Sequence, residues 1–161
     1  DSQTFKAVTG IEHVYLVSLE GFGRIERSAI SQTATEVLGR DGYEVLSAFE
    51  TAKDQAVHFA LRDKPTDETV QQLRQALHTL VYGEPKPQVW VWNGRGIVTV
   101  IGQGAQEQAD SINETLTQAG VEGAIQCQQS GNSMQVLVPA HQVRKAIRSI
   151  HSEVILHAQC K

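Results

Sequence analysis

The side chains best suited to hold a metal ion in this 161-residue sequence are its six histidines and two cysteines. A zinc or copper site needs three or four converging ligands, often supplied as closely spaced pairs. No two histidines stand four residues apart, and Cys127 and Cys160 do not form a CxxC pair. We therefore predict no metal site, and interpret His78 and His151 as favourable charges near helix C-termini.

The sequence contains none of the short motifs that position a nucleophile or a nucleotide. It lacks a G-x-S-x-G elbow, a P-loop and a G-x-G-x-x-G segment that opens a helix. Gly94-Arg95-Gly96 precedes a predicted strand, so we interpret its glycines as a hairpin or as a turn between units. We predict no catalytic residue and no cofactor in this chain.

Two glycine-containing loops are the remaining candidates for chemistry. Glu20-Gly21-Phe22-Gly23 and Gly102-Gln103-Gly104 each follow an apolar strand and precede a helix. Such a loop exposes backbone N–H groups beside a helix N-terminus, which suits a carboxylate, so an amino acid is a natural ligand. The alternative is a tight turn that uses glycine for steric reasons alone.

The elements that carry these loops occur twice. In the first half we predict strands at 13–19, 43–49, 57–61 and 88–92, and helices with apolar stripes of Ile30, Ala34, Val37 and Leu38, and of Val70, Leu73, Leu77 and Leu80. In the second half we predict strands at 96–101, 121–128 and 134–138, and helices with stripes of Ala109, Ile112 and Leu116, and of Val143, Ala146, Ile147 and Ile150. The first helix of each half is predicted to end at a glycine, Gly42 or Gly120. The strand at 57–61 alternates as if only one of its faces were buried.

This order predicts an α+β fold of two ferredoxin-like βαββαβ units in tandem, with antiparallel sheets and helices on one face. The units are predicted at 12–92 and 93–161, joined by a proline-containing turn at 82–87. The second unit needs one more strand. We predict that the spare segment at 5–10 completes it, since the alternative, the tail at 154–156, is short.

Composition excludes several classes of function. The net charge is −4, with 40% hydrophobic and 20% charged residues, so the chain lacks the basic surface that nucleic acids require. Phe59 is predicted on the core face, which argues against base stacking on the sheet, and Trp90 and Trp92 are interpreted as packing between units or subunits. No apolar run approaches the roughly 20 residues of a membrane span. Two unpaired cysteines favour a reducing compartment, and we predict the cytoplasm.

Three passages resemble a known family. They are Val8-Thr9-Gly10-Ile11, then Val100-Ile101-Gly102 with the helix end Ala119-Gly120-Val121, and last Val136-Leu137-Val138-Pro139 continuing to Ile150-His151. Together they resemble the tandem ACT-domain regulatory region of aspartokinase. The chain begins without Met or a signal peptide and is interpreted as a piece of a longer protein.

The resemblance implies a regulatory role in amino-acid biosynthesis. A kinase domain that phosphorylates L-aspartate with ATP would lie upstream, so ATP would bind outside this chain. Two copies would pair side by side in a homodimer with an eight-stranded sheet. Lysine or threonine would bind as an effector at the seam.

By position, the resemblance implies an effector pocket made from the first glycine-containing loop, the start of the following strand and the corresponding residues of the second unit. The loop residues are Glu20, Gly21, Phe22, Gly23, Arg24 and Ile25, and the strand residues are Glu44, Val45 and Leu46. The corresponding residues of the second unit are Gln103, Gly104, Ala105, Glu122 and Gly123. Arg24 would pair with the effector's carboxylate and Glu44 with its ammonium group. Both could equally be solvated surface charges.

The sequence also departs from the family. Glu44 and Glu122 stand where the family has Asn, Leu46 stands where Asp is common, and Gln129-Ser130-Gly131 replaces a Ser-Ser-Glu stretch. These departures keep two alternatives open. One is an effector-insensitive dimerisation module, and the other is a free-standing amino-acid sensor.

Overall fold

The computed structural model describes residues 5–23, 25–51, 56–80, 87–102, 104, 108–127 and 132–156. The chain divides into two compact units, one of Val14–Asn93 and one of Asp1–His13 with Gly94–Lys161. Two long strands, β1 (Phe5–Glu20) and β4 (Gln88–Gly102), contribute to both units.

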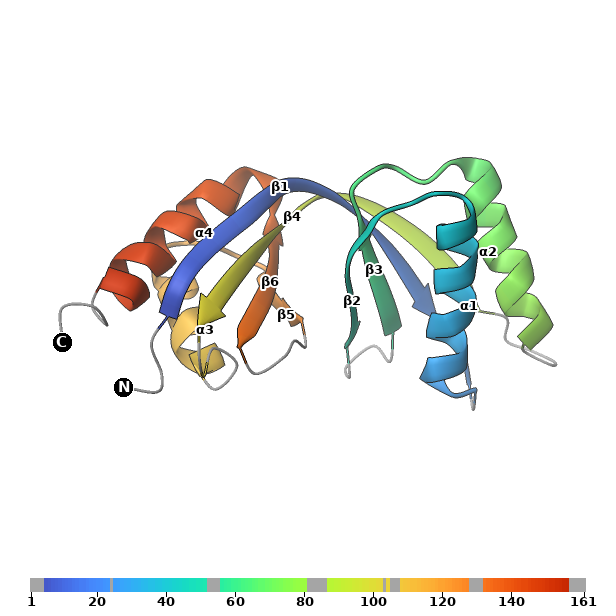
Figure 1. The fold of residues 1–161 in the computed structure, drawn as a ribbon, viewed down its shortest axis with the longest axis horizontal. Coiled ribbons are helices and arrows are strands. Elements are labelled where there is room, and N and C mark those ends of the chain that lie inside the picture. Colours follow the sequence, from blue (N-terminus) through green and yellow to red (C-terminus); the bar gives the residue numbers. More distant parts are fainter. Residues whose placement is uncertain are drawn as a thin grey trace. The chain divides into compact units, whose positions relative to one another are not determined.

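The unit 14–93 has the predicted ferredoxin-like arrangement. After β1 come α1 (Arg27–Arg40), β2 (Val45–Thr51), β3 (Ala56–Leu61) and α2 (Asp67–Leu80), and then β4. The strand order is β2-β3-β1-β4, with β3 antiparallel to both β1 and β2. Figure 1 shows α1 and α2 on the same face of these strands.

The unit containing residues 94–161 repeats this plan. After β4 come α3 (Ala109–Gln118), β5 (Ile125–Cys127), β6 (Ser133–Pro139), the 3-10 turn η2 (Ala140–Gln142), α4 (Val143–Ile150) and the π-helical turn η3 (His151–Leu156). The order is β1-β4-β6-β5, so the start of β1 occupies the place of the last strand. The predicted fold class, two ferredoxin-like units with helices on one face of antiparallel strands, is confirmed.

Each unit has its own core, built from the apolar stripes of its helices and one face of its strands. In the unit 14–93 the largest fully buried side chains are Leu19, Ile30, Leu38, Phe59, Leu61, Leu73 and Leu77. In the other unit the core includes Val98, Val100, Ile112, Leu116, Met134, Val136, Val138, Ala146 and Ile150. Phe59 therefore lies in the core, as predicted.

Two glycines end helices in the same way. Gly42 and Gly120 have φ values of 83° and 84°. The amide after each glycine donates to a carbonyl five residues earlier, from Tyr43 to Leu38 and from Val121 to Leu116. The amide of each glycine also donates, from Gly42 to Gly39 and from Gly120 to Thr117. A helix end with these two hydrogen bonds requires a residue in the left-handed conformation, which glycine adopts without steric cost.

The interpretation of Gly94-Arg95-Gly96 as a turn is wrong, because β4 runs through these residues. Within β4, Gly94 adopts a φ of 78°, a conformation that favours glycine. At Gly96 an added Cβ would lie 2.7 Å from the Ile11 carbonyl oxygen and would clash with Val143. These glycines allow a bend and a close approach within a strand.

Three other local predictions are corrected. Residues 154–156 belong to η3 rather than to a strand. The strand predicted at 121–128 is limited to β5, because Gly123 has a φ of 70° and residues 121–124 form an irregular segment. β3 is buried on both faces, since His58 and Ala60 are buried, as are the core residues that alternate with them, Val57, Phe59 and Leu61. The turn predicted at 82–87 lies outside the described residues except for Pro87.

Candidate functional site

The loop that joins β1 to α1 has a shape that its glycines determine. Gly21 and Gly23 have φ values of 80° and 62°, and the Ile25 amide donates to the Phe22 carbonyl over 3.2 Å. Between the two glycines the Phe22 side chain turns inward and is only 6% exposed. The loop is therefore a tight turn anchored by one aromatic side chain.

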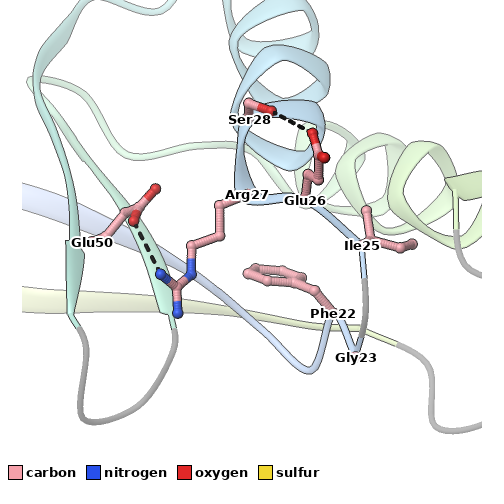
Figure 2. Close-up of a pocket in the computed structure, with 7 residues that line it drawn as sticks. All are labelled: Phe22, Gly23, Ile25, Glu26, Arg27, Ser28 and Glu50. Atoms are coloured by element: carbon pink, nitrogen blue, oxygen red, sulfur yellow. Dashed lines mark hydrogen bonds and ion pairs between the residues drawn. The ribbon is translucent and has the colours of Figure 1, made fainter.

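A hollow of about 430 Å³ opens where this loop meets the start of α1 and the end of β2 (Figure 2). Its lining comes from Phe22, Gly23, Ile25, Glu26, Arg27, Ser28 and Glu50. The volume lies within the range of small-molecule sites, and the lining combines apolar and charged groups. The hollow can therefore accommodate a small, partly polar ligand.

Strand register brings Glu50 to this loop. Glu50 pairs with Val57, and Val57 pairs with Leu19, so the three residues form a row across β2, β3 and β1. Paired residues project to the same face, and Val57 and Leu19 belong to the core under the helices. Glu50 therefore projects toward the face on which α1 begins.

An ion pair crosses the hollow. The Arg27 Nη1 atom lies 3.4 Å from Glu50 Oε2, and both side chains are about 40% exposed. Figure 2 shows Arg27 extending from the first residue of α1 toward Glu50 on β2. The Glu26 carbonyl accepts the first helical hydrogen bonds from Ala29 and Ile30, but the Glu26 side chain forms no capping hydrogen bond with α1. The hollow thus offers a cation and an anion on opposite walls.

The structure brings together only part of the predicted effector site. Phe22, Gly23 and Ile25 line the hollow, whereas Glu20 and Gly21 lie beside it in the chain without lining it. Arg24, the predicted carboxylate partner, lies outside the described residues.

Glu44, Val45 and Leu46 lie at the other end of β2. Val45 pairs with Leu61, and Leu61 pairs with Tyr15, which places this end well away from Leu19 along β1. Glu44 Oε2 accepts a hydrogen bond of 2.9 Å from Arg62 Nε. Within one unit these residues therefore do not reach the hollow.

The counterpart in the other unit is only partly described. Gly104 has a φ of 77°, whereas Gln103 and Ala105 lie outside the described residues. Glu122 and Gly123 line a different hollow of about 520 Å³ at the end of α3, together with Asn113, Thr117, Gly120, Val121 and Ala124. Gln142 braces this segment by donating to the Gly120 carbonyl over 3.2 Å and accepting from the Glu122 amide over 3.3 Å.

Sequence reasoning missed Glu26, Arg27, Ser28 and Glu50. Arg27 and Ser28 could have been found by extending the loop into the first turn of the predicted helix. Glu50 could have been found by pairing the predicted strands, because the first and second strands both run antiparallel to the third, which places their ends level with each other.

The described residues show no cluster of three or more His, Cys, Asp or Glu side chains able to hold a metal ion. In the same part of the chain, no helix combines the length and apolar character needed to cross a membrane.

Solved structures of aspartokinases share this fold. Clostridium acetobutylicum aspartate kinase is 14% identical and has a TM-score of 0.74, over 92% of this chain and 34% of its own. Escherichia coli aspartokinase III in complex with lysine and aspartate is 18% identical with a TM-score of 0.65, over 94% and 33%. The regulatory subunit of aspartate kinase from Thermus thermophilus is 15% identical with a TM-score of 0.65, over 94% and 97%.

These similarities lie in structure. No protein-family model and no curated protein matches the sequence. The chain spans about a third of the length of the two aspartokinases and nearly the whole of the regulatory subunit. The chain therefore has the fold of the tandem ACT regulatory region of aspartokinases.

Proposed function

We propose that this chain is the regulatory region of an aspartokinase, which binds an amino-acid effector and pairs with a second copy. The observation that carries the proposal is its match to a complete regulatory subunit, over 94% of this chain and 97% of that one. The phosphorylation of L-aspartate by ATP would belong to a kinase domain outside these residues, in a cytoplasmic enzyme.

The hollow beside α1 supports the choice of effector site. Its opposed charges, Arg27 and Glu50, complement the carboxylate and ammonium of an amino acid, and Phe22 and Ile25 offer apolar surface to its side chain. Lysine and threonine, which the family resemblance implies as end products, are the effectors to test first. Escherichia coli aspartokinase III, whose structure is similar to this chain, was solved in complex with lysine and aspartate.

Subunit pairing is proposed through the edge of the unit 14–93. β2 is the outermost strand in the order β2-β3-β1-β4. Two β2 strands from separate copies could pair to form a continuous eight-stranded sheet, because an edge strand has unpaired backbone groups. Glu50 lies on β2, so this pairing would bring the hollow close to the seam.

Regulation would follow from a difference in affinity. An effector favours one arrangement of paired subunits only to the extent that it binds that arrangement more tightly than the other. The bias would then be passed to the kinase domain.

A pairing module without an effector is the second candidate. It is favoured by the position of Glu44, which is paired with Arg62 rather than free to meet an ammonium group. In that case the hollow would be a passive feature of the surface.

Calorimetric titration of the 161-residue chain with lysine, threonine and methionine separates the two functions. We expect saturable heat from at least one amino acid, with a rise in Tm that grows with its concentration. At 100 times Kd the stabilisation would be about 2.7 kcal/mol. Absence of heat and of thermal shift at millimolar concentrations would contradict effector sensing and leave pairing as the function.

A further inference from the structure

We propose that Arg27 and Glu50 form a ligand-opened ion pair that selects zwitterions in the hollow of the unit 14–93. This inference rests on the proposed function, and it assigns specificity to two residues that the family resemblance did not supply. In the ligand-bound state Arg27 would hold the carboxylate and Glu50 the ammonium group, so each charge would exchange its present partner for the ligand.

The pair has the properties of an exchangeable contact. Its single contact of 3.4 Å is longer than the 2.9 Å pair of Glu44 and Arg62 in the same unit. Charge-assisted bonds that contribute strongly are shorter and often bidentate. Both partners are also exposed enough for water and a ligand to reach them, so opening the pair costs little.

The surroundings of the pair match one ligand class. A guanidinium binds a carboxylate through two parallel hydrogen bonds, and a carboxylate accepts from an ammonium group. The two charges come from different elements, α1 and β2, and face each other across the hollow (Figure 2). A ligand with only one of the two charges would leave one protein charge without an opposite partner.

The sequence of the second unit has no charged residues at the positions that correspond to Arg27 and Glu50. The two units can be aligned in two ways. When the helix ends Gly42 and Gly120 are matched, the position of Arg27 corresponds to Ala105. When the ends of the preceding strands, Glu20 and Gly102, are matched, it corresponds to Ala109. The position of Glu50 corresponds to Gln128 or Asn132 by the same two counts. None of these residues is charged at neutral pH, so the sequence of the second unit supplies no counterpart of the pair of Arg27 and Glu50 at these positions.

The test compares each amino acid with versions that lack one charge. Wild-type chain is titrated with lysine, threonine and methionine, with their carboxamides, and with the matching acids that lack every amino group, so that only the carboxylate charge remains. We expect the carboxamide of the best-binding amino acid, and its deaminated acid, to bind about tenfold or more weakly than the amino acid itself, as expected for losing a hydrogen bond to a charged group.

Two variants assign each preference to a residue. Arg27→Gln is expected to lose discrimination against the carboxamide, and Glu50→Gln to lose discrimination against the acid without the amino group. Arg40→Gln is the matched control, because it removes the same charge from the other end of α1, where Arg40 contacts Gln72. It should keep both preferences.

A structural readout complements the affinities. In the NMR spectrum of the wild-type chain, the Arg27 Nε–Hε signal, identified by its loss in Arg27→Gln, should shift on addition of the amino acid. Wild-type preferences retained in Arg27→Gln and Glu50→Gln would overturn the ion-pair inference and leave effector sensing intact. Failure of every amino acid to bind the wild-type chain would overturn the proposed function and this inference with it.

Discussion

Ser18 and His58 lie opposite each other on β1 and β3, joined by a hydrogen bond of 2.7 Å between Ser18 Oγ and His58 Nδ1. Phe49, paired with His58 on β2, stacks on the imidazole with ring centroids 4.9 Å apart. All three residues are buried, with His58 the most exposed at 8%. The row is a buried polar contact on the face of the sheet opposite the helices.

Ser18→Ala is expected to destabilise the protein, because it removes a hydrogen-bond partner from a buried imidazole. The free energy of unfolding should fall by about 1–2 kcal/mol. Urea denaturation followed by circular dichroism measures it. Ser28→Ala is the control, since Ser28 is exposed and its contact with Glu26 is long, at 3.5 Å. Equal stabilities for the two variants would show that the Ser18 contact contributes nothing.

Substitutions at two glycines should act in opposite directions. Gly96→Ala places a methyl group against Val143 and the Ile11 carbonyl, and overpacking of this kind costs about 1–3 kcal/mol. Gly39→Ala, in α1, meets no atom within 4 Å and should stabilise the protein by about 0.5–1 kcal/mol through lower backbone entropy of the unfolded chain. Thermal denaturation of both variants checks the signs, and a stabilised Gly96→Ala would contradict the close packing of β4.

Cys127 should be unreactive in the folded protein. Burial of the thiol raises its pKa from 9.0 to about 12, against a smaller opposing effect of a hydrogen bond with the Leu137 backbone. Thiolate is the reactive form, so a thiol reagent at pH 8 should label Cys127 much more slowly in the folded chain than in guanidinium. Cys160→Ser isolates the signal, and equal rates in both conditions would contradict the burial.

The same shift predicts a pH dependence of stability. Between pH 9 and 12 the unfolded chain loses the Cys127 proton while the folded chain keeps it, so the free energy of unfolding should fall as pH rises. The stability difference between wild type and Cys127→Ala should shrink across this window. A constant difference would contradict the raised pKa.

Trp90 and Trp92 lie on β4, three strands from the proposed β2 seam in the strand order, so their burial on dimer formation would show a second contact surface, as the sequence interpretation of them predicts. They are the two tryptophans of the chain, are 46% and 51% exposed, and have ring centroids 6.3 Å apart. Packing against a second copy would lower acrylamide quenching of their fluorescence as protein concentration rises. Unchanged quenching across a range in which sedimentation shows dimer formation would exclude these residues from the interface.

The spacing of apolar residues predicted the fold because the same order of strands and helices occurs in both halves of the chain. The stripes of Leu73 and Leu77 and of Ala146 and Ile150 are buried as expected. Periodicity could not assign Val154, because a short apolar run is compatible with either a strand or a helix turn. Gly94 was misread because glycine in a strand and glycine in a turn look alike in sequence.

Of the residues that line the candidate site, the sequence predicted only those in the loop between β1 and α1. Phe22 and Gly23 follow from local sequence, since the glycines determine the turn. Glu50 depends on the register of three strands, and the pairing of Glu44 with Arg62 depends on a contact between residues 18 positions apart. Such contacts are set by tertiary packing, which the resemblance alone did not resolve.

An amino-acid effector is proposed to bind beside the first residues of α1, and mapping of backbone NMR shifts tests this binding site most directly. On titration with lysine, threonine or methionine, we expect the largest shifts at residues 22–28 and at Glu50, with little change at residues 120–124. Saturating shifts centred on 120–124, or no shifts at millimolar concentrations of all three, would contradict it.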